Sequence, residues 1–252
     1  MTTELKLGKT PARPDAVKLK LSNYLTGTLP KAPRKFGHTN LIGDWQMLGN
    51  DRYGDCVFAG AAHETLLWNA QGGHPVTFSD QSVLSDYSAV TGFNPNNPNT
   101  DQGTDMQAAA SYRRKTGVVD ANGNRHVVTA YLSIEAGNVH QHQIAAYLFG
   151  AVGIGISFPK SAMAQFNAGK AWSVVPGSPI EGGHYIPLVA RNNGFICVTW
   201  GRTQRMTDVF FKKYNDESIA YVSLESLSNG KTLEGFDSAT LIDDLAQITS
   251  VV

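Results

Sequence analysis

A cysteine and a histidine that lie far apart in the sequence have the side chains needed for covalent catalysis. Cys56 follows Tyr53-Gly54-Asp55, a turn that leads into an expected helix, so its thiol falls in the first helical turn. The partial positive charge of a helix N-terminus favours a thiolate, and the free N–H groups there can bind an oxyanion. His184 follows two glycines at the start of an apolar strand, where a substrate chain has room. In contact, the two would form a nucleophile and its general base.

Each of the two residues also has a purely structural interpretation. Cys56 can be a small residue that fits the start of a helix, and His184 can be an edge-strand histidine with solvent on one side. Asp55 disfavours a thiolate beside it unless its side chain turns away to cap the helix. Cys197 lies in an apolar run, so we expect it to be a buried thiol, whereas Cys56 is presented. One core thiol and one presented thiol suit a reducing compartment.

The remaining histidines do not predict a metal site. His140 and His142 are two residues apart at an expected helix start, so their side chains diverge, and no group of Cys, Asp or Glu completes a ligand set. His63 falls within the first expected helix and is predicted to lie on its surface. We therefore expect no metal ion and no other cofactor.

The elements that would position these residues change in type along the chain. Apolar residues spaced by three and four predict helices over 55–69, 79–90 and from 106 to Gly117. Runs of apolar and β-branched residues then predict strands over 127–134 and 152–158, a helix over 141–149, and a hairpin of 184–190 with 194–200. The last residues are expected to form a helix over 208–214, a strand over 220–224 and an amphipathic end over 239–248. Helices followed by strands indicate an α+β fold with segregated halves.

Residues 1–40 are predicted to form an extended basic arm. They contain eight Lys or Arg residues against two acidic ones, with four prolines and no helical period. The preferred interpretation is a leader that is solvated or draped over the surface, because no aromatic stacking platform for nucleic acid accompanies the charge. Docking onto a protein partner or a neighbouring subunit is the alternative, and removal as a propeptide stays open.

The length, composition and net charge of the chain disfavour several classes of function. With 252 residues, 42% of them apolar and 17% charged, the chain is expected to form one globular domain over 41–252. The formal net charge is zero, so neither nucleic acid nor an anionic membrane is an expected partner. No apolar stretch reaches the length of a membrane span, and no signal peptide is expected. We expect a location in the cytoplasm or in an intracellular or viral assembly.

Residues 50–59, Asn-Asp-Arg-Tyr-Gly-Asp-Cys-Val-Phe-Ala, resemble the nucleophile segment of the papain-like cysteine peptidases. In that family a glutamine six residues before the cysteine helps to build the oxyanion hole, and Asn50 stands at this position. Asp101-Gln102-Gly103 is similar to the second helical landmark of the family, and 183–189 and 195–201 are similar to the strands that carry its histidine and its Trp-Gly pair. The catalytic pair is 128 residues apart, near the separation of about 130 or more in such enzymes.

The resemblance implies a papain-like α+β fold. Its helical part, about 41–120, would pack against a C-terminal antiparallel sheet or half-barrel, about 121–252. Cys56 would attack the substrate, His184 would transfer the proton, and the Cys56 amide with the Asn50 side chain would bind the oxyanion. The likeness also places four residues along the substrate cleft: Gly54, Gly103, Gly183 and Trp200.

The third catalytic residue of the family, an asparagine that orients the histidine, has no direct counterpart here. Alignment on Trp200-Gly201 puts Val198 at its position, and valine has no hydrogen-bonding side chain. In a hairpin with an even-numbered loop over 191–194, however, facing residues have numbers with an odd sum, so Thr199 shares a face with His184. Thr199 is therefore the predicted orienting residue, although a hydroxyl is a weaker acceptor than an amide oxygen.

Three functions are consistent with these residues. The first is a thiol-dependent hydrolase, a cysteine peptidase or amidase that takes a peptide or amide substrate. The second is a papain-like scaffold with relaxed catalysis that serves as a binding or structural component of an assembly. The third is acyl transfer, which uses the same cysteine and histidine.

Overall fold

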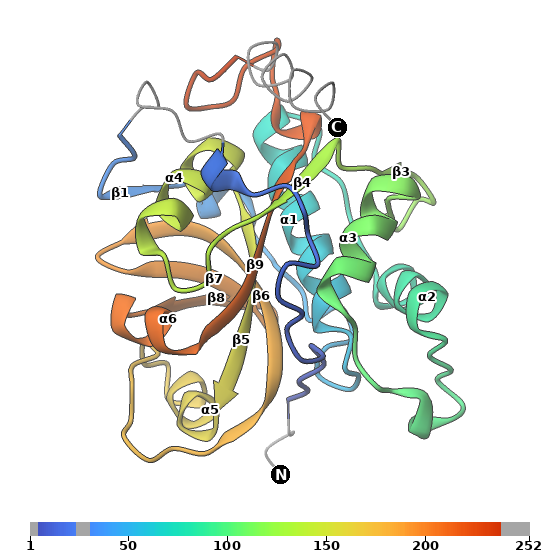
Figure 1. Ribbon diagram of the computed structural model, residues 1–252. Helices are drawn as coiled ribbons and strands as arrows, with labels where there is room; N and C mark the ends of the chain where they lie inside the picture. The colour runs from blue at the N-terminus through green and yellow to red at the C-terminus, as the bar shows by residue number, and fades with distance from the viewer. Residues whose placement is uncertain (1–4, 24–30, 238–252) are drawn as a thin grey trace.

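The computed structural model describes residues 5–23 and 31–237, and it confirms the α+β fold class. One half of the molecule contains the helices α1 (Cys56–Gly72), α2 (Asp80–Thr91) and α3 (Met106–Lys115), at the centre and right of Figure 1. The other half is a seven-stranded antiparallel sheet accompanied by the helices α4 (Val139–Phe149), α5 (Lys160–Asn167) and α6 (Asp208–Tyr214). Cys56 begins the first helix, and His184 lies in the sheet, so the two halves must meet to form a site.

The sheet is organised around one long strand. The strand order is β4-β9-β5-β6-β7-β8, and β1 also pairs with β6. The strands are β1 (Lys35–Gly37), β4 (Ala130–Ser133), β5 (Val152–Pro159), β6 (Ile180–Asn192), β7 (Phe195–Thr199), β8 (Arg202–Met206) and β9 (Asn215–Val222). A separate pair, β2 (Val118–Val119) and β3 (Arg125–His126), lies in the helical half. Short 3₁₀ turns complete the described elements: η1 (Leu21–Asn23), η2 (Thr39–Leu41), η3 (Pro98–Thr100) and η4 (Leu224–Ser226).

Strand β5 shows why this segment of the sequence forms a buried strand. Ile154, Ile156 and Phe158 alternate along it, and all three are fully buried in the apolar core of the sheet half. Gly153 and Gly155 point to the opposite face, where other groups approach the backbone closely. This glycine face therefore leaves room beside the strand that carries His184.

Most predicted elements are confirmed, with shifts at their ends. The prediction of one continuous strand over 127–134 is wrong. The chain leaves β3 and crosses to the other half before β4 begins. The N–H of Val128 donates to the carbonyl oxygen of Arg113 in α3, and the next N–H donates to Val222 in β9. The strand expected over 220–224 is the end of β9, and the amphipathic segment over 239–248 lies outside the described residues.

The hairpin of β6 and β7 is present, but its register near the turn differs from the prediction. Arg191 pairs with Phe195, a pair with an even sum, so the loop is not even-numbered. A β-bulge at Val189 then shifts the register, and Leu188 pairs with Cys197, a pair with an odd sum. Beyond the bulge the predicted parity therefore holds, because one extra residue reverses the side-chain faces of the strand.

The prediction that His63 lies on a helix surface is wrong. Every residue of α1 except Ala70 is buried, because β6, α2 and η4 surround the helix. His63 is 2% exposed, and its Nε2 lies 3.1 Å from the carbonyl oxygen of Gln46. A helix that is covered on all sides has no polar face for the sequence pattern to reveal.

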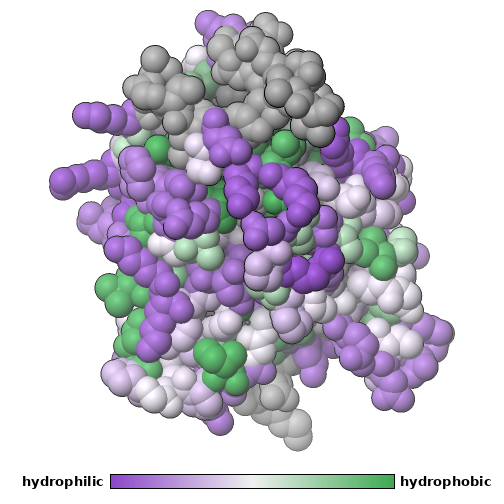
Figure 2. Space-filling view, in the orientation of Figure 1, coloured by the Kyte–Doolittle hydropathy of each residue, from purple (hydrophilic) through white to green (hydrophobic). Residues whose placement is uncertain are grey.

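Over its described residues the basic arm is draped over the molecule, with every one of its basic residues exposed except Lys9. Residues 5–21 run between the helical half and the sheet half, as the dark blue segment in Figure 1 shows. Val17 and Leu21 belong to the two apolar cores, and Lys9 is also buried. On the face that Figure 2 shows, hydrophilic residues dominate and hydrophobic ones form separate small patches. In the described part of the chain, none of the helices is long and apolar enough to cross a membrane.

A buried ion pair in the helical half contacts two tyrosines of the sheet half. Arg113 of α3 and Glu64 of α1 are 2% and 0% exposed, and Arg113 Nη1 lies 2.6 Å from Glu64 Oε2. The Tyr185 hydroxyl of β6 donates to the other carboxylate oxygen at 3.0 Å, and the guanidinium lies 3.8 Å from the Tyr221 ring of β9. The pair therefore links α1, α3, β6 and β9 through a single buried cluster.

Replacing Arg113 with methionine is expected to lower the free energy of unfolding by about 3–5 kcal/mol, because Glu64 then loses its partner in the interior. Urea unfolding followed by circular dichroism measures this loss. Arg114→Met is the matched control, since Arg114 is exposed on the same helix, and it should change stability by less than about 0.5 kcal/mol. The double variant Glu64→Gln/Arg113→Met should recover part of the loss; equal effects at Arg113 and Arg114 would contradict the assignment.

Candidate active site

Cys56 lies against the backbone of His184. The peptide N–H of Tyr185, which is bonded to the carbonyl carbon of His184, donates a hydrogen bond to Cys56 Sγ at 3.4 Å. The fold therefore brings together two residues that are far apart in the chain. The thiol is not presented to solvent as predicted, because Cys56 is only 1% exposed. Cys197 is buried as expected, and both cysteines are free thiols.

The ring of His184 is fixed from three sides. Its Nε2 lies 2.7 Å from the Thr199 hydroxyl oxygen, the contact that the parity argument predicted. The Trp200 ring stacks on the imidazole at 4.4 Å with an angle of 14°, and the Phe158 ring meets it edge-on at 5.7 Å. Its Nδ1 is buried without a hydrogen-bond partner among the described residues. If Nε2–H donates to Thr199, the assigned tautomer leaves Nδ1 free to accept a proton.

Burial keeps both members of the pair neutral in this structure. It raises the pKa of the Cys56 thiol to about 12, although the N–H groups of Tyr185 and Gly8 act in the opposite direction. It lowers the pKa of the His184 imidazole to about 3. Charge is costly in a buried site, so the thiol keeps its proton and the imidazole does not take it up. Among the described residues no hydrogen bond joins Cys56 Sγ to His184 Nδ1, so proton transfer between them stays a prediction.

Asp55 does not cap the helix as predicted. Its side chain makes no capping hydrogen bond at the start of α1, and the side-chain amide of Asn50 is its neighbouring polar group. Asp55 is fully buried, and burial raises its pKa well above the usual value for a carboxyl group. Burial favours the neutral carboxyl group, but the Asp55 carboxylate still acts to raise the pKa of Cys56, so the expected conflict with a thiolate persists in direction.

Asn50 lies in the loop before the helix and is buried. Its side-chain N–H donates to the carbonyl oxygen of Tyr53 at 3.1 Å, which fixes the turn that leads to Gly54. The same side-chain amide also interacts with the Asp55 carboxyl group and acts to lower its pKa. The oxyanion role of Asn50 stays a prediction.

All four residues predicted along the substrate cleft contact the N-terminal segment. The Trp200 indole N–H donates to the carbonyl oxygen of Lys6 at 3.1 Å. The carbonyl oxygen of Gly183 accepts hydrogen bonds from Gly8 at 3.2 Å and from Lys9 at 3.0 Å. A methyl group on Gly103 would lie 2.2 Å from the carbonyl oxygen of Gly8, and one on Gly54 would lie 3.1 Å from that of Leu7. The glycines thus make room for a peptide backbone, and the chain's own residues 6–9 occupy that room.

The opposite wall of the cleft binds the same segment through Thr104. Its N–H donates to the carbonyl oxygen of Gly8 at 2.7 Å, and its carbonyl oxygen accepts from Thr10 at 3.1 Å. Farther along, the Arg13 guanidinium forms a bidentate ion pair with Asp105 at the start of α3. An extended peptide therefore runs through the cleft with main-chain hydrogen bonds to both halves, as a strand does in β-augmentation.

Sequence reasoning did not find Lys9, Thr104, Asp216 or Glu217, which all take part in the closed cleft. Lys9 is one of many basic residues in the arm, and the acidic pair lies in a segment that the strand prediction missed. The available signal is Gly8, an isolated glycine between Leu7 and Lys9, since such a glycine marks close approach of another backbone. A methyl group on Gly8 would lie 1.9 Å from the carbonyl oxygen of Gly54.

The described residues contain no group of three or more His, Cys, Asp or Glu side chains that could hold a metal ion. His142, one of the two histidines considered for a metal, is fully buried in α4. Its Nδ1 lies 2.7 Å from the carbonyl oxygen of Asn138, and its Nε2 lies 2.7 Å from the hydroxyl of Ser218. Both ring nitrogens are therefore used in structural contacts.

The fold is similar to those of solved cysteine proteases, although the sequences differ widely. Xylellain, a cysteine protease from Xylella fastidiosa, matches with a TM-score of 0.65 at 13% identity, over 88% of this chain and 97% of that chain. Procathepsin B S9 from Trypanosoma congolense matches with a TM-score of 0.56 at 11% identity, over 88% and 84% of the two chains. The Carica candamarcensis protease CMS1MS2, solved with E-64, matches at 0.55 and 12% identity, over 76% and 99%. No protein-family model and no curated protein sequence matches this chain.

The cover over the thiol leads to a prediction for its reactivity. Gly8→Val is expected to move the segment out of the cleft, because the new Cβ would meet the Gly54 carbonyl, and to speed alkylation of Cys56 by iodoacetamide at least tenfold. The rate in the unaltered chain should keep rising with pH toward about 12, the pKa of the buried thiol, whereas the variant should level off at lower pH. Peptide mapping by mass spectrometry separates Cys56 from Cys197.

The matched control is Gly43→Val, since a methyl group on Gly43 meets no heavy atom within 4 Å. It should leave the alkylation rate of Cys56 unchanged. Fast labelling of Cys56 in the unaltered chain, or equal rates in the two valine variants, would show that the segment does not cover the thiol in solution.

Proposed function

Because the chain has the fold of the papain-like cysteine proteases, we propose that it is a thiol-dependent hydrolase of peptide or amide bonds, with Cys56 as nucleophile and His184 as base. One observation carries the proposal: an extended peptide, residues 6–10 of the chain itself, lies over the thiol with main-chain hydrogen bonds to both cleft walls. A groove that binds a peptide backbone beside a cysteine and an oriented histidine is suited to hydrolysis of that backbone.

In the proposed reaction, His184 Nδ1 takes the proton of the Cys56 thiol, and the sulfur attacks the substrate carbonyl carbon. The carbonyl oxygen becomes an oxyanion, which the Cys56 backbone N–H and the Asn50 side chain bind. The imidazolium then gives its proton to the leaving amine as the carbon–nitrogen bond breaks, which leaves a thioester on Cys56. Water, deprotonated by His184, hydrolyses the thioester and restores the thiol.

Thr199 is assigned an orienting role in this reaction. Its hydroxyl holds Nε2 of His184, so Nδ1 is the nitrogen that faces the chemistry. Trp200 and Phe158 pack around the ring and exclude water from that hydrogen bond. A hydroxyl can rotate, whereas the family's amide oxygen is fixed, so this pair depends more on the packing of Trp200.

The covered structure corresponds to a latent form in this proposal. The cleft has no room for a substrate while Gly8 lies against Gly54, and the neutral thiol is a poor nucleophile. Release of residues 6–10, by cleavage of the arm or by its displacement, therefore precedes turnover. The propeptide interpretation of the arm becomes the preferred one over docking onto a neighbouring subunit.

A scaffold with relaxed catalysis is the second candidate. It is favoured by the same cover, because a chain that never releases residues 6–10 would keep Cys56 inert. The two candidates differ in one measurement, the hydrolysis of internally quenched peptides by the full-length Gly8→Val chain. The hydrolase predicts turnover that Cys56→Ala abolishes; a folded Gly8→Val chain with a rapidly alkylated Cys56 and no hydrolysis would favour the scaffold.

Thr199→Val in the Gly8→Val background is expected to lower kcat by ~10- to 100-fold with little change in KM, because the imidazole loses its orienting partner but the cleft stays intact. Thr199→Ser keeps a hydroxyl and should retain most of the activity. Steady-state kinetics with one quenched peptide measures both parameters. Equal losses in the valine and serine variants, or a change confined to KM, would contradict an orienting role.

A further inference from the structure

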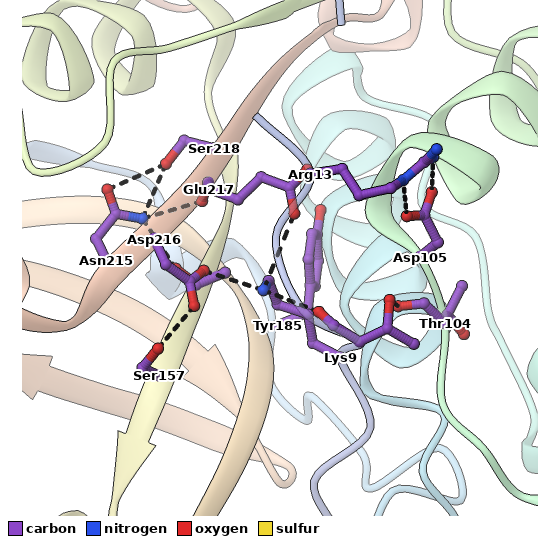
Figure 3. Close-up of polar contacts among 12 residues, drawn as sticks. Lys9, Arg13, Thr104, Asp105, Ser157, Tyr185, Asn215, Asp216, Glu217 and Ser218 are labelled. Carbon is purple, nitrogen blue, oxygen red and sulfur yellow. Dashed lines mark hydrogen bonds and ion pairs between the residues drawn. The ribbon is translucent and has the colours of Figure 1, made fainter. Parts of the chain in front are cut away.

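The ammonium of Lys9 lies between the carboxylates of Asp216 and Glu217 (Figure 3). The Lys9 side chain is 1% exposed, and its Nζ lies 3.0 Å from Asp216 Oδ1 and 3.9 Å from Glu217 Oε2. The ammonium also donates to the carbonyl oxygen of Thr10 at 3.1 Å. Lysine is almost never fully buried without a partner of opposite charge. The two carboxylates of β9 therefore explain how the cleft can enclose a lysine side chain.

A β-bulge in β9 brings the carboxylates of Asp216 and Glu217 to the same face of the sheet. Consecutive residues of a regular strand point to opposite faces of the sheet. Gly155 pairs with Glu217, whereas the next residue, Ile156, pairs with Asn215, so Asp216 is the extra residue of a bulge in β9. Bulges re-aim side chains in this way and are common beside active sites. As a result, both Asp216 and Glu217 reach the ammonium of Lys9.

Neighbouring residues fix the bulge and leave space beside it. The Asn215 side-chain N–H groups donate to the carbonyl oxygens of Gly155 at 2.9 Å and Glu217 at 3.0 Å. The Ser157 hydroxyl donates to Asp216 Oδ2 at 2.9 Å. A methyl group on Gly155 would lie 2.0 Å from Lys9 Cε, so only glycine at this position admits the aliphatic part of the lysine. We call Gly155, Ser157, Asp216 and Glu217 the acidic pocket.

From this geometry we infer that the acidic pocket selects a lysine or arginine side chain of the substrate peptide, at the residue next to the one that lies over Cys56. In this structure Lys9 occupies the pocket in place of a substrate side chain. The inference rests on the proposed function for its substrate, but the pocket's preference is a matter of binding and can be measured without hydrolysis.

The selectivity of the acidic pocket depends on whether the substrate side chain supplies a positive charge to its two carboxylates. The hydrogen bonds that Gly183 and Thr104 make to residues 8–10 involve only main-chain atoms, so they do not discriminate between peptide sequences. The acidic pocket does discriminate. The side chains of Asp216 and Glu217 are only 28% and 14% exposed, and an apolar substrate side chain would leave them without a counter-charge. A glutamate would add a further carboxylate beside Asp216 and Glu217, where burial already raises the pKa of Glu217 to about 7. Lysine and arginine each supply the missing positive charge on an aliphatic stem that fits over Gly155.

The test uses the full-length chain with an open cleft and no nucleophile, Gly8→Val/Lys9→Ala/Cys56→Ala. Fluorescein-labelled alanine/glycine octapeptides, identical except for lysine, arginine, norleucine or glutamate at one central position, are titrated and followed by fluorescence anisotropy. Lysine and arginine peptides should bind about tenfold or more tightly than the norleucine peptide, and the glutamate peptide most weakly.

Two further variants show whether the pocket causes the preference. Asp216→Asn/Glu217→Gln should abolish the advantage of lysine over norleucine. Gly155→Val keeps both carboxylates but blocks the aliphatic stem of a bound lysine, so it should lower the affinity for the lysine peptide most. This variant replaces the double variant if the double variant does not fold. Glu181→Gln is the matched control, since Glu181 is an exposed carboxylate elsewhere on β6, and it should preserve the preference.

Equal or tighter binding of norleucine by the folded open chain, or no binding of any peptide, would overturn the inference. So would a lysine preference that survives the loss of both carboxylates. Hydrolysis is measured separately in the open chain that retains Cys56. Selective binding without hydrolysis would refute the proposed function alone, and hydrolysis without a basic preference would refute the pocket's role alone.

The unaltered arm offers a second measurement of the same pocket. Lys9→Met in the otherwise native chain leaves the acidic pocket without its cation, so residues 6–10 should leave the cleft more often and Cys56 should be alkylated several-fold faster. Lys6→Met is the control, because Lys6 is exposed in the same segment. Equal alkylation rates in the two methionine variants would show that the pocket contributes nothing to binding of a lysine.

Discussion

Main-chain hydrogen bonds from residues 8–10 to Gly183 and Thr104 connect the N-terminal segment to both halves of the molecule beside Cys56. They place a peptide backbone over the thiol. Burial raises the pKa of the thiol and lowers the pKa of the imidazole, whose ring is enclosed by Trp200 and Phe158. In the proposed reaction, proton transfer from Cys56 to His184 therefore requires that this burial be relieved. A thiolate–imidazolium pair needs solvent or a polar substrate to offset the cost of separating charge in the interior.

Two β-bulges give the cleft its chemistry. The bulge at Val189 reverses the faces of β6 relative to β7, and without it His184 and Thr199 would lie on opposite sides of the sheet. The bulge at Asp216 adds a second carboxylate to the face on which Glu217 already lies. One extra residue in each strand therefore creates, in one case, an oriented imidazole and, in the other, a pocket for a cation.

The sequence predicted the parts of this site that depend on local pattern. The turn before Cys56, the Gly-Gly-His strand and the order of helices and strands all follow from residue types and their spacing, and they were enough to identify the fold. The contact between Thr199 and His184 was predicted on the assumption of an even-numbered hairpin loop. The loop is odd-numbered, but the bulge at Val189 restores the predicted parity. His63 and Asp55 were misplaced because their burial depends on tertiary packing around α1, which no local period encodes. Lys9 was missed because its partner carboxylates lie more than 200 residues away.

The tether of the arm sets how a substrate can compete for the cleft. A segment attached to the domain through a short connection has an effective concentration on the order of millimolar, so a free peptide at micromolar concentration is at a large disadvantage even with equal contacts. The main-chain hydrogen bonds are the same for both, and Lys9 already satisfies the two carboxylates. A better substrate side chain therefore gains little over the arm. Access to Cys56 depends on what removes residues 6–10, because substrate concentration alone shifts the equilibrium only weakly.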